Sequence, residues 1–286
     1  MNERKARVDI FQDTLRRCKD DPDLADAIGS SLKRTHILYG EEAFRFPCSA
    51  GLHSPVITVT AKRSFQAARD LSHKYPGRSI GVLNFANENE PGGAVLSGSA
   101  AQEESLCRCS TLYPCLNTER LKNEYYGAGN KTGDFRGSGT VVFIPDVIVF
   151  KTDEELPALL PNAEWMNVNV LVCAAPDRRD ERAIAYDADR KEAVYMGGRD
   201  WTDLYRKRIR SILFEAYSQG IEVLVLGAWG SGGFKNRPEQ VARAFRDCLR
   251  RYGKYFEAIE FAIDDRTGSQ RESDNLAIYR EVLELR

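Results

Sequence analysis

The sequence lacks the long apolar runs and the excess of positive charge that mark membrane proteins and many nucleic-acid-binding proteins. None of its 286 residues lie in a stretch approaching the roughly 18 apolar residues that a membrane span needs. The N-terminus has no apolar segment typical of a secretory signal. Basic and acidic residues nearly balance, at 41 and 42, so direct nucleic-acid binding is not indicated. We therefore expect a cytoplasmic globular protein without a membrane partner.

Histidine and cysteine are too few, and wrongly spaced, for a common metal site. There are seven cysteines, an odd number, which without a signal segment favours reduced cytosolic thiols. Cys107, Cys109 and Cys115 lie close together in the sequence, but their spacing matches no usual zinc pattern and all three histidines lie upstream. We expect no metal and no cofactor.

Apolar segments alternate with amphipathic ones along most of the chain. Strands are predicted at 56–60, 79–85, 141–144, 147–150, 168–173, 223–226 and 259–263. Helices are predicted at 62–75, 102–112, 117–126, 202–218, 238–252 and 272–285. The charged residues 177–200 are predicted to be a solvated excursion. Strands alternating with helices indicate an α/β sheet covered by helices on both faces.

Residues 1–34 are also predicted to be helical, with a break at the Asp-Asp-Pro-Asp cluster of residues 20–23. This region could be an extension packed on the main domain or a part of the wall of a ligand site, and the first interpretation is favoured. The chain is therefore divided into an N-terminal helical extension, residues 1–54, and a main domain, residues 55–286.

The most informative segment joins a glycine turn to a pair of carboxylates. The strand at 79–85 leads to Pro-Gly-Gly-Ala at 91–94, and after seven more residues the chain reads Gln-Glu-Glu at 102–104. A strand, a glycine loop and a helix in this order present backbone N–H groups to a phosphate. Adjacent glutamates at a helix start can simply complement the helix dipole. Beside a glycine loop, however, they favour acid–base chemistry next to a bound anion.

A second glycine loop supports the first. The strand at 223–226 runs into Gly-Ala-Trp-Gly-Ser-Gly-Gly-Phe at 227–234, and Pro238 opens the next helix. Ligands bind at the carboxyl ends of strands in such sheets, and both loops are placed there. One glycine loop alone is a weak signal, whereas two loops and a glutamate pair together are a strong one. Trp229, between glycines, is expected to be exposed at the rim of the pocket.

These motifs resemble those of the bacterial-type poly(ADP-ribose) glycohydrolases, a branch of the macrodomains. The signature of that family has three glycines, a short connector and Gln-Glu-Glu; its second loop grips a diphosphate, here at 230–234. In this chain the third glycine is Ala94, whose methyl group could strain a turn that needs positive φ or hold the backbone away from phosphate. The resemblance covers roughly residues 55–265. It implies a macrodomain-like three-layer α/β/α sandwich with a mixed central sheet.

The resemblance further implies an ADP-ribosyl glycohydrolase that cleaves ribose–ribose O-glycosidic bonds of poly(ADP-ribose), from chain ends and without a metal. Such cleavage passes through an oxocarbenium-like state, and the leaving oxygen needs a proton. A carboxylic acid can supply the proton and then activate water. By resemblance Glu104 is this acid, and Glu103 holds ribose hydroxyls.

The other candidate residues would bind the ligand or support the loops that do. Asn84 and Asn87 are favoured as loop supports, because asparagine is common in turns. Phe234 is either a core residue or, by resemblance, presses on the distal ribose. The predicted ligand-binding set is Asn84, Ala86, Asn87, Pro91, Gly92, Gly93, Ala94, Gln102, Gly227, Gly230, Ser231, Gly232, Gly233 and Phe234. The expected partners are ADP-ribose, poly(ADP-ribose) or an ADP-ribosylated protein.

Two alternatives remain open at this point. The first is a non-catalytic macrodomain that only binds ADP-ribose; Ala94 favours it, and retention of Gln102, Glu103 and Glu104 opposes it. The second is a different hydrolase on the same fold, which removes single ADP-ribose units from protein or nucleic acid, or acetyl from acetylated ADP-ribose.

Overall fold

A seven-stranded mixed sheet forms the centre of the protein in the computed structural model, which describes residues 3–40, 45–47, 53–126, 139–179, 184–187, 192–195, 198–264 and 270–283. Its order is β1-β4-β5-β3-β8-β9-β2. The strands of this sheet are β1 (His36–Leu38), β2 (Val56–Thr60), β3 (Ile80–Ala86), β4 (Val141–Val149), β5 (Met166–Ala174), β8 (Val223–Leu226) and β9 (Ala258–Ala262). A separate hairpin consists of β6 (Ile184–Asp187) and β7 (Glu192–Tyr195).

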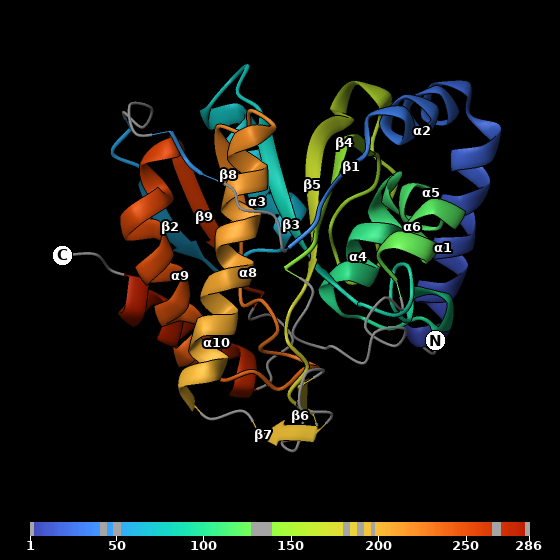
Figure 1. The fold of residues 1–286 in the computed structure, drawn as a ribbon. Helices are drawn as coiled ribbons and strands as arrows, with labels where there is room; N and C mark the ends of the chain where they lie inside the picture. The colour runs from blue at the N-terminus through green and yellow to red at the C-terminus, as the bar shows by residue number, and fades with distance from the viewer. Residues whose placement is uncertain are drawn as a thin grey trace.

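Helices cover both faces of the sheet (Figure 1). One layer contains α8 (Gly198–Ser218), α9 (Pro238–Tyr252) and α10 (Gln270–Leu283). The opposite layer contains α1 (Glu3–Asp20), α3 (Ser64–Lys74), α4 (Gln102–Cys109), α5 (Leu112–Leu116) and α6 (Glu119–Glu124), and α2 (Pro22–Arg34) packs near β4. The predicted three-layer α/β/α sandwich is confirmed. No helix in the described ranges is long and apolar enough to cross a membrane.

Strand direction brings the two glycine loops to one edge of the sheet. β5, β3, β8, β9 and β2 are parallel to one another, whereas β4 runs antiparallel to both of its neighbours, β5 and the edge strand β1. The carboxyl ends of β3 and β8 therefore lie next to each other. All four residues of β8 are buried, as expected for a strand between two helical layers.

Side chains alternate between two cores along each strand. Val82 and Val225 join the core under α3 and α4, whereas Leu83 and Leu224 join the core under α8 and α9. This alternation follows the two-residue period of a strand. Six cysteines in the described part of the chain are buried free thiols: Cys18, Cys107, Cys109, Cys115, Cys173 and Cys248.

Several predicted bounds differ from the structure for identifiable reasons. The strands predicted at 141–144 and 147–150 are one strand, β4, with a register shift between Ile144 and Val147. Asp146 has a φ of 50°, so the chain bulges there and pairing resumes. The excursion predicted at 177–200 contains the hairpin of β6 and β7 and the start of α8.

The N-terminal region begins as predicted and then joins the sheet. The break falls at Asp21, whose side chain accepts from the N–H groups of Asp23 (3.0 Å) and Leu24 (3.3 Å), with Pro22 at the first helical position. After α2 the chain forms β1, which pairs with β4 at the edge of the sheet. The division of the chain at residue 54 stays a prediction.

Candidate functional site

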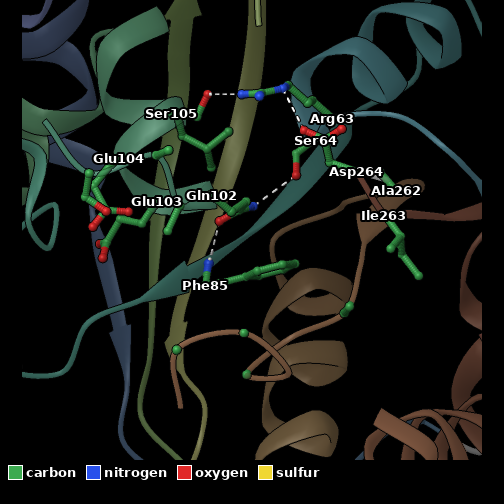
Figure 2. Close-up of a pocket in the computed structure, with 18 of the residues that line it drawn as sticks. Arg63, Ser64, Phe85, Gln102, Glu103, Glu104, Ser105, Ala262, Ile263 and Asp264 are labelled. Atoms are coloured by element: carbon green, nitrogen blue, oxygen red, sulfur yellow. Dashed lines mark hydrogen bonds and ion pairs between the residues drawn. The ribbon is translucent and has the colours of Figure 1, made fainter. Parts of the chain in front are cut away.

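A cavity of about 490 Å³ opens at the edge of the sheet where the two glycine loops meet. Its walls come from the end of β3, the first turns of α3 and α4, the loop after β8, and the end of β9. Figure 2 shows Glu103 and Glu104 at one side of this cavity and the residues after β9 at the other. The volume is within the range of about 300–1,000 Å³ that is usual for sites of small molecules and cofactors.

The glycine turn passes so close to the glutamate pair that two of its positions require glycine. Gly92 and Gly93 have φ values of 69° and 58°. A β-carbon on Gly93 would lie 2.7 Å from Glu104 Oε1 and 3.2 Å from Glu103 Oε2. A β-carbon on Gly92 would lie 2.7 Å from the ring of Tyr113. Glycine at both positions therefore allows the left-handed turn and the close approach.

The third signature position does not require glycine. Ala94 has φ −94° and ψ 29°, values open to any residue, and its side chain is exposed. The strain that the methyl group could have caused is absent. The backbone N–H of Ala94 donates to Glu104 Oε1 at 2.9 Å. The position therefore contributes its backbone N–H group to the glutamate pair.

Glu103 is buried and held by the loop that precedes the turn. Its Oε1 accepts from Asn84 Nδ2 (3.1 Å), and its Oε2 accepts from the N–H of Asn87 (2.7 Å). Burial raises the pKa of Glu103 to about 8, and the charge of Glu104 acts in the same direction. The hydrogen bonds from Asn87, Asn84 and Gly92 oppose this rise without cancelling it.

Glu104 follows Glu103 in the first turn of α4 and is 7% exposed. Both side chains line the cavity. Their oxygens come together at Gly93, where an added β-carbon would lie against both carboxylates. Two carboxyl groups beside one cavity can act as a proton donor and a hydrogen-bond acceptor for the same ligand.

The side chain of Gln102 connects α4 to β3 and to α3. Its Oε1 accepts from the N–H of Phe85 (2.9 Å), and its Nε2 donates to Leu83 O (2.8 Å) and Ser64 Oγ (3.0 Å). Asn87 makes a similar local support, because its Oδ1 accepts from the N–H groups of residues 89 (2.8 Å) and 90 (3.1 Å). These two side chains are occupied in shaping the site.

The glycines of the second loop have two different roles: one is required by the loop conformation, and two leave open space. Gly230 has a φ of 73°, and a β-carbon there would lie 2.5 Å from Ala175 Cβ and from Asn236 Nδ2. Asn236 Nδ2 also donates to Gly230 O at 3.0 Å, which fixes the loop. Gly232 and Gly233 line the cavity, and a β-carbon on either would meet no atom within 4 Å. The last two glycines therefore leave room beside the cavity.

Trp229 is not at the rim, and the prediction that it is exposed was wrong. It is completely buried, and its Nε1 donates to Cys173 O at 2.9 Å on β5. The indole thus anchors the second loop from below. Gly227 is equally enclosed, since a β-carbon there would lie 2.6 Å from Ala262 O and 2.8 Å from Phe85 Cζ.

Half of the predicted catalytic and ligand-binding residues line the cavity. Eight predicted residues line it: Asn87, Gln102, Glu103, Glu104, Gly230, Gly232, Gly233 and Phe234. The other eight lie outside its lining: Asn84, Ala86, Pro91, Gly92, Gly93, Ala94, Gly227 and Ser231. The phosphate-binding and catalytic roles of these residues stay predictions. Asn84 acts on the cavity indirectly, through its bond to Glu103.

Several residues that line the cavity were not predicted from the sequence. Arg179 belongs to the charged excursion, yet its guanidinium lies 5.3 Å from the ring centre of Phe234 at the cavity. Lys62, Arg63 and Asp264 line the far end. Their only sequence signal is that they follow predicted strands. Among the described residues, no group of three or more His, Cys, Asp or Glu side chains is placed to hold a metal ion.

Known proteins with this arrangement are ADP-ribose-processing enzymes. The structure of poly(ADP-ribose) glycohydrolase from Thermomonospora curvata is 28% identical, with a TM-score of 0.80 over 98% of this chain and 100% of that one. A second structure of that enzyme, bound to the inhibitor ADP-HPD, has a TM-score of 0.79 at 28% identity over 97% and 99% of the two chains. The Deinococcus radiodurans enzyme in complex with ADP-ribose is 30% identical, with a TM-score of 0.73 over 90% and 96%. No curated protein matches the chain.

Residues 6–152 match the family model described as microbial-type PARG, catalytic domain. The chain belongs to this family of poly(ADP-ribose) glycohydrolases, as the two motifs predicted.

The raised pKa of Glu103 predicts how stability changes with pH. The folded-state pKa of Glu103, about 8, lies above its ordinary value of 4.5. As the pH rises between these two values, Glu103 ionises in the unfolded chain but not in the folded protein, so the free energy of unfolding decreases. Glu103→Gln cannot titrate. The difference in unfolding free energy, variant minus wild type, should therefore rise between pH 5 and pH 8 by at least about 1 kcal/mol. Urea titrations at several pH values measure it, and parallel curves for the two proteins would contradict the assignment.

The Ala94 N–H predicts a contrast between two substitutions. Ala94→Gly keeps the donor to Glu104 and should change turnover less than tenfold. Ala94→Pro removes the donor, while its φ of about −65° is near the native value, so turnover should fall by about 10²-fold or more. Turnover of an ADP-ribose polymer measures both, and Ala94→Ser is the control that keeps the N–H. Equal activity of the proline and serine variants would show that this bond is unimportant.

Proposed function

We propose that this chain cleaves the ribose–ribose O-glycosidic bonds of poly(ADP-ribose) and releases ADP-ribose, from chain ends and without a metal. One observation carries the proposal: two buried glutamates and the open glycines of the second loop face the same cavity. The family of the chain supports it, as do relatives that bind ADP-ribose or ADP-HPD.

The second loop is the proposed diphosphate site. Gly232 and Gly233 leave a groove free of side chains, and backbone N–H groups recognise phosphate without a cation. Arg179, which pairs with Asp177, places its guanidinium near Phe234 at this side of the cavity. The distal ribose would then lie between Phe234 and the glutamate pair.

Glu104 is the proposed general acid. The pKa of Glu103 is raised and would by itself favour that residue for the role. However, both Glu103 oxygens already accept hydrogen bonds, from Asn84 and from the Asn87 N–H, so this carboxyl group is engaged in holding the segment at the end of β3 and is less free to pass a proton to a ligand. Among the hydrogen bonds of the described residues, Glu104 accepts through Oε1, from the Ala94 N–H. It can therefore protonate the leaving oxygen and then activate water, while Glu103 accepts from ribose hydroxyls.

One experiment separates the proposed activity from its alternatives. The protein is incubated, in buffer with EDTA, with poly(ADP-ribose) and with mono-ADP-ribosylated protein, and free ADP-ribose is measured. Release from the polymer is expected. Release from the mono-ADP-ribosylated protein alone would favour the second hydrolase, and binding of ADP-ribose without release from either substrate would favour a reader. The relaxed backbone at Ala94 removes one argument for a reader.

Glu104→Gln should lose turnover and keep binding. The amide retains an oxygen that can accept the Ala94 N–H but cannot donate the required proton, so the rate should fall by about 10²–10⁴-fold. Calorimetry with ADP-ribose should give a dissociation constant within a few-fold of wild type. Near wild-type turnover in this variant, together with loss in Glu103→Gln, would exchange the two roles.

Gly232→Val should abolish ADP-ribose binding without unfolding the loop. The added side chain meets no protein atom near its β-carbon, so it projects into open space beside the cavity, where the diphosphate is proposed to bind. Calorimetry measures the loss, and an unchanged melting temperature shows that the fold is intact. Gly232→Ala, with a smaller side chain, should bind more weakly than wild type but better than valine. Unchanged affinity in the valine variant would place the diphosphate elsewhere.

A further inference from the structure

The N-terminal helix α1 is hydrogen-bonded to the connector, residues 95–101, that joins the glycine turn to the glutamate pair. Three arginines donate to three consecutive carbonyl oxygens of this connector. These bonds run from Arg4 Nε to Ser97 O (2.6 Å), from Arg7 Nε to Gly98 O (2.8 Å) and from Arg108 Nη1 to Ser99 O (2.5 Å). Two of the arginines come from α1 and one from α4, so the connector lies between these helices.

The sequence of the connector permits this close contact. Gly98 has a φ of 75°, and a β-carbon there would overlap the carbonyl oxygen of Arg4 and lie 3.0 Å from Val8 Cγ2. Any other residue would push α1 away. Glycine at position 98 therefore has a packing role that is separate from phosphate binding.

The start of α4 depends on such outside contacts, because its own cap is weak. Its N-cap residue is Ala101, which has no side-chain hydrogen bond to the helix. At the far end of α4, Thr14 Oγ1 of α1 donates to Arg108 O at 2.6 Å. Helix α1 thus holds both the segment before α4 and its last turn. The glutamates project from the turn between these two contacts.

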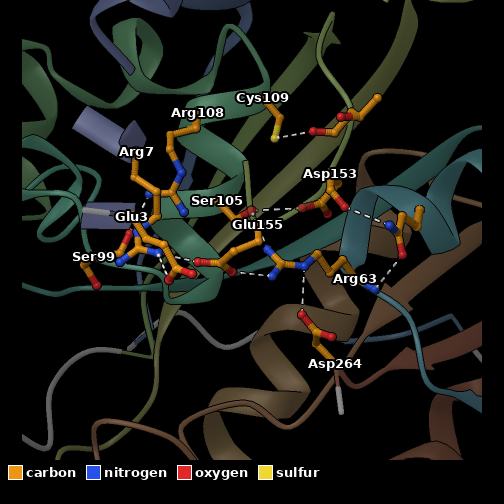
Figure 3. Close-up of polar contacts among 12 residues, drawn as sticks. Glu3, Arg7, Arg63, Ser99, Ser105, Arg108, Cys109, Asp153, Glu155 and Asp264 are labelled. Carbon is orange, nitrogen blue, oxygen red and sulfur yellow. Dashed lines mark hydrogen bonds and ion pairs between the residues drawn. The ribbon is translucent and has the colours of Figure 1, made fainter. Parts of the chain in front are cut away.

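A second chain of polar contacts runs from α1 to both walls of the cavity (Figure 3). Arg7 Nη1 donates to Glu155 Oε1, and Glu155 Oε2 accepts from Arg63 Nη2 at 2.8 Å. Arg63 Nη1 donates to Ser105 Oγ at 3.3 Å, next to Glu104, and Arg63 Nε pairs with Asp264 Oδ2 at 2.8 Å, after β9. Since Arg63 is 9% exposed and Glu155 is 39% exposed, these ion pairs are only partly screened by solvent.

We propose that α1 is a positioning element of the catalytic site and that Arg7 is its central residue. Arg7 contacts the connector at Gly98 O and also begins the series of ion pairs through Glu155, so it fixes α4 relative to the glycine turn. The family model begins at residue 6, within α1, which agrees with a helix that is integral to the domain. The inference rests on the proposed role of Glu104, whose proton transfer depends on placement within a fraction of an ångström.

The test compares Arg7→Ala, Arg7→Lys and Arg16→Ala with wild type on poly(ADP-ribose). Arg16 is a matched control, because it lies on the same helix and pairs only with Asp13 among the described contacts. We expect Arg7→Ala to lower kcat at least about tenfold and to keep the ADP-ribose dissociation constant within about threefold. Arg7→Lys keeps the positive charge but lacks the planar guanidinium that bonds two partners at once, so its kcat should lie between those of wild type and Arg7→Ala. Arg16→Ala should behave as wild type.

Glu155→Gln is a second variant for the case that Arg7→Ala is poorly folded, since residue 155 is partly exposed. This substitution weakens the ion pairs of residue 155 with Arg7 and Arg63. We expect kcat to fall about threefold or more at unchanged ADP-ribose affinity. Kinetics of Arg7→Ala equal to those of Arg16→Ala, or equal losses in kcat and affinity, would overturn the inference. An inactive wild type would instead overturn the proposed function, so the two failures are distinguishable.

Discussion

The contact between the backbone of Gly93 and the two carboxylates of Glu103 and Glu104 is the constraint on which the site depends. A carbon atom at this position would touch both side chains, so the turn and the start of α4 can approach only without it. The approach allows the next N–H, that of Ala94, to reach Glu104. A change that moves the turn therefore moves Glu104 too, and the first glycine loop and the glutamate pair form one structural unit.

Burying two carboxylates in one place is costly, and the surroundings show how the cost is limited. Glu103 receives hydrogen bonds from Asn84 and from the Asn87 N–H, and its pKa is still raised, which favours the neutral form. The buried Oδ1 of Asn84 has no partner among the described residues. If its amide turned over, that oxygen could accept a proton held by a neutral Glu103. The site can therefore accommodate either ionisation state of this carboxyl group.

The sequence predicted best those features that depend on neighbouring residues. The strand at 223–226 and the helix at 238–252 have the predicted bounds, because a buried run between glycines and a proline at the first helical position are local signals. The glutamate pair and both glycine loops were located in the same way. Features that depend on distant partners were missed: β1 is three residues long and pairs with β4, and Trp229 is buried because it bonds to Cys173. The backbone angle of Ala94 and the place of Arg179 at the cavity likewise follow from tertiary structure.

The thiols behind the glutamates have a consequence for redox chemistry. Cys107 and Cys109 are fully buried in α4, and burial raises the pKa of both far above the ordinary value, so the reactive thiolate is suppressed. Cys107 lies directly under the glycine turn, where its sulfur would be 3.2 Å from a β-carbon on Gly92. An oxidant or alkylating reagent can reach these sulfurs only when α4 is displaced from its position against the core. The two thiols are thus shielded from oxidation while α4 is in place, and the rate at which they react reports how often α4 moves away.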